Sequence, residues 1–270
     1  MIPYLRGWTT VQRTPQSNLQ LGAMLCFVAG ATNAGGFLAV GQYTSHMTGV
    51  VSSVADNLVL GNISLVFVAL ASLLAFVSGA MTTVWMVNWG LRRKLQSAYG
   101  RPLLLEAGLL LVFGLFGSGI NFFAGLFVPL TVLVLCFIMG LQNAVITKIS
   151  HAEIRTTHVT GLVTDLGIEL GKLLYINRLT RDNLVTANRT KLRIHSVLIT
   201  SFFLGGLAGA IGFKVFGFIT TVPLALCIVL VVWHPVFVDA RTWIEPQIGR
   251  KTAIPPAKVE KSAQLDGEER

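Results

Sequence analysis

Six apolar runs, each long enough to cross a lipid bilayer as a helix, constrain this chain more than any other feature. A helix needs about 17–25 predominantly apolar residues to span a bilayer. The composition agrees, because 53% of the residues are hydrophobic, 12% are charged and the mean hydropathy is +0.68. An all-α polytopic membrane protein is therefore predicted. The runs fall near residues 19–36, 63–88, 103–120, 123–147, 194–213 and 215–233.

The chain divides by composition into four parts. A polar segment, 1–18, precedes the first run, and the tail 234–270 is charged and contains several prolines. We expect the first to be cytoplasmic and the tail to be disordered in the cytoplasm, because neither has enough apolar surface to bury. Two membrane parts remain, 19–122 and 123–233.

These two membrane parts repeat one sequence pattern. The stretch 26–34 aligns with 136–144, 110 positions later. A His-x-Thr-Gly segment at 46–49 aligns with another at 158–161, 112 positions later. Matches that keep the same order indicate common ancestry or a common fold constraint. We call 46–49 the first HxTG segment and 158–161 the second HxTG segment.

The repeat also predicts a topology. Each half contains three apolar runs. Because three is odd, the second half begins on the opposite side of the membrane and is inverted relative to the first. The stretches 46–60 and 158–174 must then be re-entrant, and both carry carboxylates that are costly facing lipid. If they crossed the membrane instead, the chain would have eight spans and parallel halves.

Charge decides between these topologies. With six spans, both termini and every Lys and Arg except Lys214 lie on the cytoplasmic side, as the positive-inside tendency requires. We therefore predict six transmembrane helices. They form a 3+3 inverted repeat, and each half contains a short re-entrant or broken helix.

The segment His46-Met47-Thr48-Gly49-Val50 follows the first span. From about Leu19 to Trp233 the chain resembles the YoaK-type family, bacterial inner-membrane proteins of unknown function marked by Met-Thr-Gly-Asn at this place. Val50 stands where that family commonly has Asn, and Asn33 where it often has Asp. The resemblance implies a shared fold, a location in the bacterial inner membrane and no established activity.

The polar residues related by the repeat are the candidate binding residues. Helix N-termini carry free N–H groups and a partial positive charge, and two of them would approach the midplane from opposite sides. We expect a site for a small polar or anionic solute there, with the two threonines capping the helices. A purely structural use, in caps and interhelical hydrogen bonds, is the alternative. The candidates are His46, Thr48, Gly49, His158, Thr160, Gly161, Asn33 and Asn143.

Charged residues in the short stretches form a second candidate group, Asp56, Asp165, Glu169 and Lys172. Glu169 and Lys172 are three residues apart, so they lie on one helix face. The group forms either a proton relay, for which Asp165 is the best member, or an internal ion pair that orients the segment.

Several function classes are excluded or disfavoured. The sequence has no HExxH, Walker or Gly-x-Ser-x-Gly motif and no CxxC spacing, so we predict no enzyme, metal or cofactor. The net charge of +9 is concentrated beside apolar runs, so the bilayer rather than nucleic acid is the expected partner. The leading function is a transporter or channel for a small solute. The alternative is a non-transporting membrane protein that assembles with or scaffolds partner membrane proteins, and the sequence leaves a homo-oligomer open.

Overall fold

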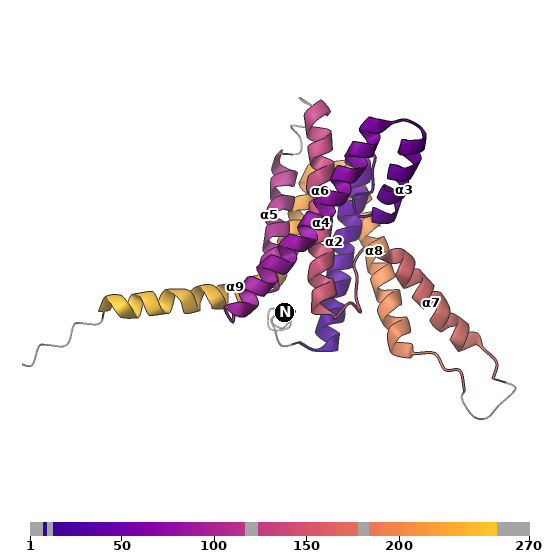
Figure 1. Cartoon of the computed structure of the whole chain (residues 1–270). Helices are drawn as coiled ribbons and strands as arrows, with labels where there is room; N and C mark the ends of the chain where they lie inside the picture. The colour runs from indigo at the N-terminus through magenta and orange to yellow at the C-terminus, as the bar shows by residue number, and fades with distance from the viewer. Residues whose placement is uncertain (1–7, 10–12, 117–123, 178–183, 253–270) are drawn as a thin grey trace, which may run out of the picture.

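Helices form all the regular structure in the residues that the computed structural model describes, which are 8–9, 13–116, 124–177 and 184–252 (Figure 1). The long helices are α2 (Pro15–Val40), α4 (Ile63–Arg92), α5 (Gly100–Phe116), α6 (Ala124–Ile149), α8 (Arg189–Phe216) and α9 (Thr221–Thr252). The shorter elements are α3 (Met47–Val59), α7 (Val159–Leu174) and a 3-10 turn, η2 (Gly217–Thr220). Each predicted apolar run lies mainly on one long helix, which confirms the all-helical prediction for the described residues.

Four helical stretches of the described residues are long and apolar enough to cross a membrane. They are Pro15–Val40, Ile63–Arg92, Pro129–Ile149 and Arg189–Arg241. The last contains 53 residues, because it joins α8, η2 and part of α9. These lengths and compositions are those of a helical membrane protein.

Local signals explain where α2 begins and ends. Thr14 is its N-cap, and the Thr14 Oγ1 accepts a hydrogen bond from the Ser17 backbone N–H at 3.2 Å. Pro15 occupies the first turn, where a missing N–H costs nothing. Gly41 ends the helix with φ 74°, a left-handed conformation that glycine adopts without strain, and its N–H donates to the Phe37 carbonyl at 2.8 Å.

Glycines permit the close crossings of α2 with α8 and of α4 with α6. A Cβ on Gly30 of α2 would lie 2.1 Å from the Phe202 carbonyl oxygen of α8. A Cβ on Gly140 of α6 would lie 2.0 Å from the Phe76 carbonyl oxygen of α4. Since no larger residue permits this backbone approach, both crossings depend on glycine. Gly30 and Gly140 are also 110 positions apart, the offset of the sequence repeat.

The short helices each fold back on the following long helix, at opposite ends of the bundle (Figure 1). α3 lies beside the beginning of α4 at the top of the view, and α7 beside the beginning of α8 at the bottom. None of the α3 residues is buried, whereas α7 buries Leu162 and Glu169. Both short helices therefore lie on the outside of the bundle, and α7 is packed more firmly.

The end of α9 differs from the sequence prediction. Disorder was expected from His234, but α9 continues to Thr252, and its last part extends away from the bundle (Figure 1). The Asp239 carboxylate of α9 accepts hydrogen bonds from the backbone N–H groups of Gln96 and Ser97, at 3.0 and 2.8 Å. These bonds hold the helix against the segment between α4 and α5. Residues 253–270 lie outside the described part of the chain.

Candidate functional site

One cavity of about 660 Å³ reaches both HxTG segments. It lies between α4 and α6, and the beginnings of α3 and α7 line it from two sides. The structure thus brings together segments that are 112 positions apart in the chain. Its lining residues are Ser45, His46, Met47, Thr48, Phe76, Ala80, Val84, Gly140, Asn143, Ala144, Thr147, Lys148, Arg155, Thr157, His158 and Thr160.

Each HxTG segment places its histidine ring over its own glycine. A Cβ on Gly49 would lie 2.2 Å from the His46 Cδ2, and a Cβ on Gly161 would lie 2.2 Å from the His158 Cε1. Residues three apart at the beginning of a helix share one face, which explains the spacing of the motif. The two glycines therefore make room for imidazole rings. They are absent from the cavity lining themselves, although we expected them to admit a ligand.

The threonines do not cap the short helices, which corrects the sequence prediction. His46 and His158 are the N-cap residues, so Thr48 and Thr160 lie in the first turn. Neither cap residue makes a side-chain hydrogen bond to its helix. The helices begin two residues earlier than expected, and their first-turn N–H groups have no capping side chain.

Asn33 and Asn143 anchor the chain just before each histidine. The Asn33 Oδ1 accepts hydrogen bonds from the Ser45 N–H at 3.2 Å and the Ser45 Oγ at 2.9 Å. The Asn143 Oδ1 accepts from the Thr157 N–H at 3.3 Å and the Thr156 Oγ1 at 2.9 Å. Asn143 also donates from Nδ2 to the Thr157 Oγ1. Each amide ties a short segment to the long helix before it.

Two cations in the cavity were missed by sequence reasoning. Lys148 and Arg155 line it, although their basic segment had been interpreted only as a cytoplasmic loop. None of the described lining residues is acidic. For Lys148 a signal was available, because it lies four residues after Ala144 on the face of α6 that lines the cavity, whereas Arg155 lies in the loop after α6 and had no such signal. The cavity is consequently positive and lined with hydroxyl, amide and imidazole groups.

The acidic candidates lie outside this cavity. Glu169 is 5% exposed, and its Oε1 accepts a hydrogen bond from the Lys172 Nζ at 2.8 Å. Its Oε2 accepts from the Asn188 backbone N–H at 2.6 Å, which ties α7 to the beginning of α8. Asp56 and Asp165 are exposed on the short helices. The geometry brings Glu169 and Lys172 together as an ion pair and leaves the two aspartates apart from it.

A second hollow, of about 300 Å³, adjoins the first HxTG segment between α3 and α4. His46 lines both hollows, whereas His158 lines only the large cavity among those described. Gln42, Tyr43 and Ser72 give the smaller hollow a partly polar wall. His46 therefore stands at the boundary between the two hollows.

Comparison with known proteins places the chain among membrane proteins. A family model described as "Protein of unknown function (DUF1275)" matches residues 21–233. The UPF0700 transmembrane protein YoaK of Bacillus subtilis (strain 168) is 28% identical over 166 residues, which cover 58% of this chain and 68% of that protein. No solved structure matches. Together with the apolar helices, these matches identify a membrane protein of a transmembrane family whose function is unknown.

Proposed function

We propose a transport function for this chain, which belongs to the DUF1275 family of proteins of unknown function. The cavity lined by both HxTG segments, called the central cavity below, conducts a small anionic solute across the bacterial inner membrane. The cavity acts as the substrate site of a transporter or channel, without covalent chemistry. The observation that carries this proposal is the single cavity lined by both HxTG segments, Lys148 and Arg155.

The proposed architecture is a 3+3 inverted repeat of six spans. A 53-residue helical stretch would be about 80 Å long, far more than the roughly 30 Å of bilayer hydrocarbon, so α8 and α9 are two crossings. Gly217, with φ 64°, and η2 separate them. The paired crossings of α2 with α8 and α4 with α6 support an inverted relation between the halves.

The short helices are proposed to be re-entrant. α3 has 13 residues and α7 has 16, about 20 and 24 Å, which is too short to cross. Their N-terminal ends both line the central cavity while their bodies lie at opposite ends of the bundle (Figure 1). Irregular backbone within a membrane is stable where it is buried in protein or lines a cavity, and this cavity offers it hydroxyl, amide and basic side chains.

An anion fits the site better than a cation or an apolar solute. Two helix N-termini direct partial positive charge into the cavity, and two basic side chains add full charges. Arginine and hydroxyl groups donate the hydrogen bonds that carboxylate, sulfate or phosphate oxygens accept.

Topology is tested by a reporter fused after Arg93. Six spans with cytoplasmic termini place that position in the cytoplasm, so we expect activity from a cytoplasmic reporter and none from a periplasmic one. Periplasmic activity would mean that the short helices cross the membrane, and the inverted repeat would be abandoned.

Transport is tested with the full chain in proteoliposomes. Uptake is measured for a panel of small carboxylates, sulfate and phosphate, with matched neutral polar solutes and small cations as controls. We expect at least one anion to be taken up faster than into empty liposomes, and the controls not to be. If no solute is taken up and none raises the melting temperature, the non-transporting alternative replaces the proposal.

A further inference from the structure

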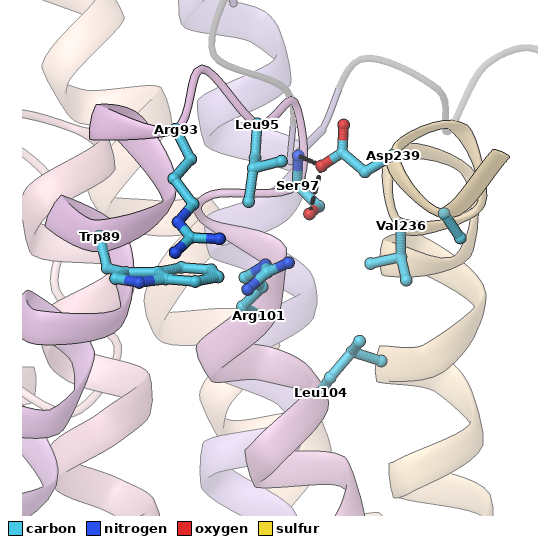
Figure 2. A pocket seen from close by; sticks show the side chains of 9 residues that line it. Trp89, Arg93, Leu95, Ser97, Arg101, Leu104, Val236 and Asp239 are labelled. Atoms are coloured by element: carbon cyan, nitrogen blue, oxygen red, sulfur yellow. Dashed lines mark hydrogen bonds between the residues drawn. The ribbon is translucent and has the colours of Figure 1, made fainter. Parts of the chain in front are cut away.

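A separate pocket of about 490 Å³ lies where α4 ends, α5 begins and α9 passes (Figure 2). Arg93 and Arg101 lie against the same indole, with their guanidinium carbons 4.4 and 4.5 Å from the centre of the Trp89 ring. A guanidinium over an aromatic face is held by the ring quadrupole and keeps its N–H edges available. Neither arginine is ion-paired within the described part of the chain.

The acidic residue of this pocket is engaged elsewhere. Figure 2 shows Asp239 directed at Ser97, across the pocket from the arginines. It accepts hydrogen bonds from the Ser97 N–H at 2.8 Å and the Ser97 Oγ at 2.6 Å, besides the bond from the Gln96 N–H. Its charge therefore holds the segment between α4 and α5 to α9, and the arginine side of the pocket stays positive.

An apolar hollow of about 410 Å³ continues from the arginines along α4. Trp89 and Arg101 line both spaces, and Trp85 and Met86 line the continuation. Trp85 is 66% exposed, on a long apolar helix that is mostly exposed in the described structure. This face of α4 is directed at lipid, and tryptophan is enriched where a span meets the headgroup region.

We propose that this pocket binds one anionic phospholipid. Arg93 and Arg101 hold the oxygens of its phosphodiester, as basic pockets between spans hold anionic headgroups. One acyl chain lies along Trp85 in the adjoining hollow. This second surface is what favours a lipid over a free anion, because a soluble phosphate has no apolar part to occupy it. The proposal does not depend on transport by the central cavity.

The test measures lipid binding to the full chain in an uncharged detergent. Phosphatidylglycerol and phosphatidylcholine of equal chain length are compared by melting temperature and by the lipid retained in native mass spectrometry. We expect phosphatidylglycerol to stabilise the protein and the double change Arg93→Gln and Arg101→Gln to weaken its binding about tenfold or more. Trp85→Ala should weaken binding of both lipids.

The matched control removes two neighbouring exposed charges, by Arg92→Gln and Lys94→Gln. Equal loss in the control would mean unspecific surface attraction and would overturn the proposal. Inorganic phosphate that stabilises as strongly as phosphatidylglycerol, or displaces it, would identify a soluble-anion site and would also overturn it. The melting temperature in phosphatidylcholine alone verifies folding, and the single change Arg93→Gln replaces the double variant if that variant does not fold.

Discussion

The two HxTG segments have the same local construction and a different electrostatic setting. In both, a histidine N-cap covers a glycine three residues later, and an asparagine of the preceding long helix holds the chain just before it. Only the second segment is accompanied by cations, Lys148 and Arg155. Only α7 is tied to its neighbouring helix by a buried carboxylate, that of Glu169.

From the repeat alone, both halves would be expected to play the same part in the cavity. The structure indicates that their parts differ. The second half supplies the positive charge of the cavity and a firmly anchored short helix. The first half supplies α3, which buries none of its residues, and His46, which stands between two hollows. We expect the second segment to determine which charge is accepted and α3 to be the more mobile of the two short helices.

The largest effect is expected from removing the charges of the second half. Lys148→Gln together with Arg155→Gln should lower anion uptake about a hundredfold, since each charged hydrogen bond to a solute is worth about tenfold or more. The uptake rate at low solute concentration measures this loss. Arg189→Gln with Arg193→Gln is the control, because both are exposed on α8 and absent from the cavity lining. A similar loss in the control would show that the overall charge matters and that the halves do not differ in this task.

The asparagine anchors give the next largest effect, on stability. Asn143→Ala removes three hydrogen bonds and Asn33→Ala removes two, so we expect losses of about 3 and 2 kcal/mol in the free energy of unfolding. Chemical denaturation in detergent measures both.

The aspartate variants sharpen this test of the anchors. Asn33→Asp should retain most of the stability, because only Oδ1 of Asn33 is used. Asn143→Asp should not, because the Nδ2 donor to Thr157 is lost. Equal behaviour of the two variants would show that the anchors are equivalent.

The helices were predictable from hydropathy, but their ends were not. Hydropathy detects only the apolar part of a helix. The run near 194–213 therefore missed the first turn of α8, where Arg189 and Lys191 are exposed. The 234–252 part of the tail was misread because its prolines and charges are typical of disorder. The bond between Asp239 and Ser97, which holds α9 against the segment between α4 and α5, joins residues 142 positions apart and leaves no local signal.

Within the site, the repeat predicted the histidines and asparagines, and helical spacing could have indicated Lys148, whereas only the three-dimensional structure places Arg155 at the cavity. Arg155 reaches the cavity because the chain reverses after α6, where His151 and Ala152 have φ of 52° and 69°. Positive φ at residues other than glycine is uncommon, and the sequence gives no sign of it there. Similarly, Thr48 and Thr160 were expected as caps because threonine is a preferred cap residue, whereas histidine occupies that position in both segments.

A smaller effect should separate the carboxylates of the short helices. Glu169→Gln weakens the ion pair with Lys172 and the bond from Asn188, so we expect the free energy of unfolding to fall by about 1–2 kcal/mol. Asp165→Asn and Asp56→Asn are matched changes at exposed positions and should leave stability and uptake unchanged. Loss of uptake with intact stability in Asp165→Asn would instead support the proton relay.

The smallest effect is the coupling between the two HxTG segments. Gly49→Ala and Gly161→Ala each add a Cβ that would lie 2.2 Å from a histidine ring atom, so each displaces its imidazole in the shared cavity. Alanine is favourable within a helix, so folding is retained and the melting temperature verifies it. Each single variant should slow uptake several-fold. Because both rings line one cavity, the double variant should lose less than the product of the single losses, with a coupling energy of about 0.5–1 kcal/mol. Losses that simply multiply, measured as uptake rates for the four proteins, would show that the segments act independently and that the cavity is not one site.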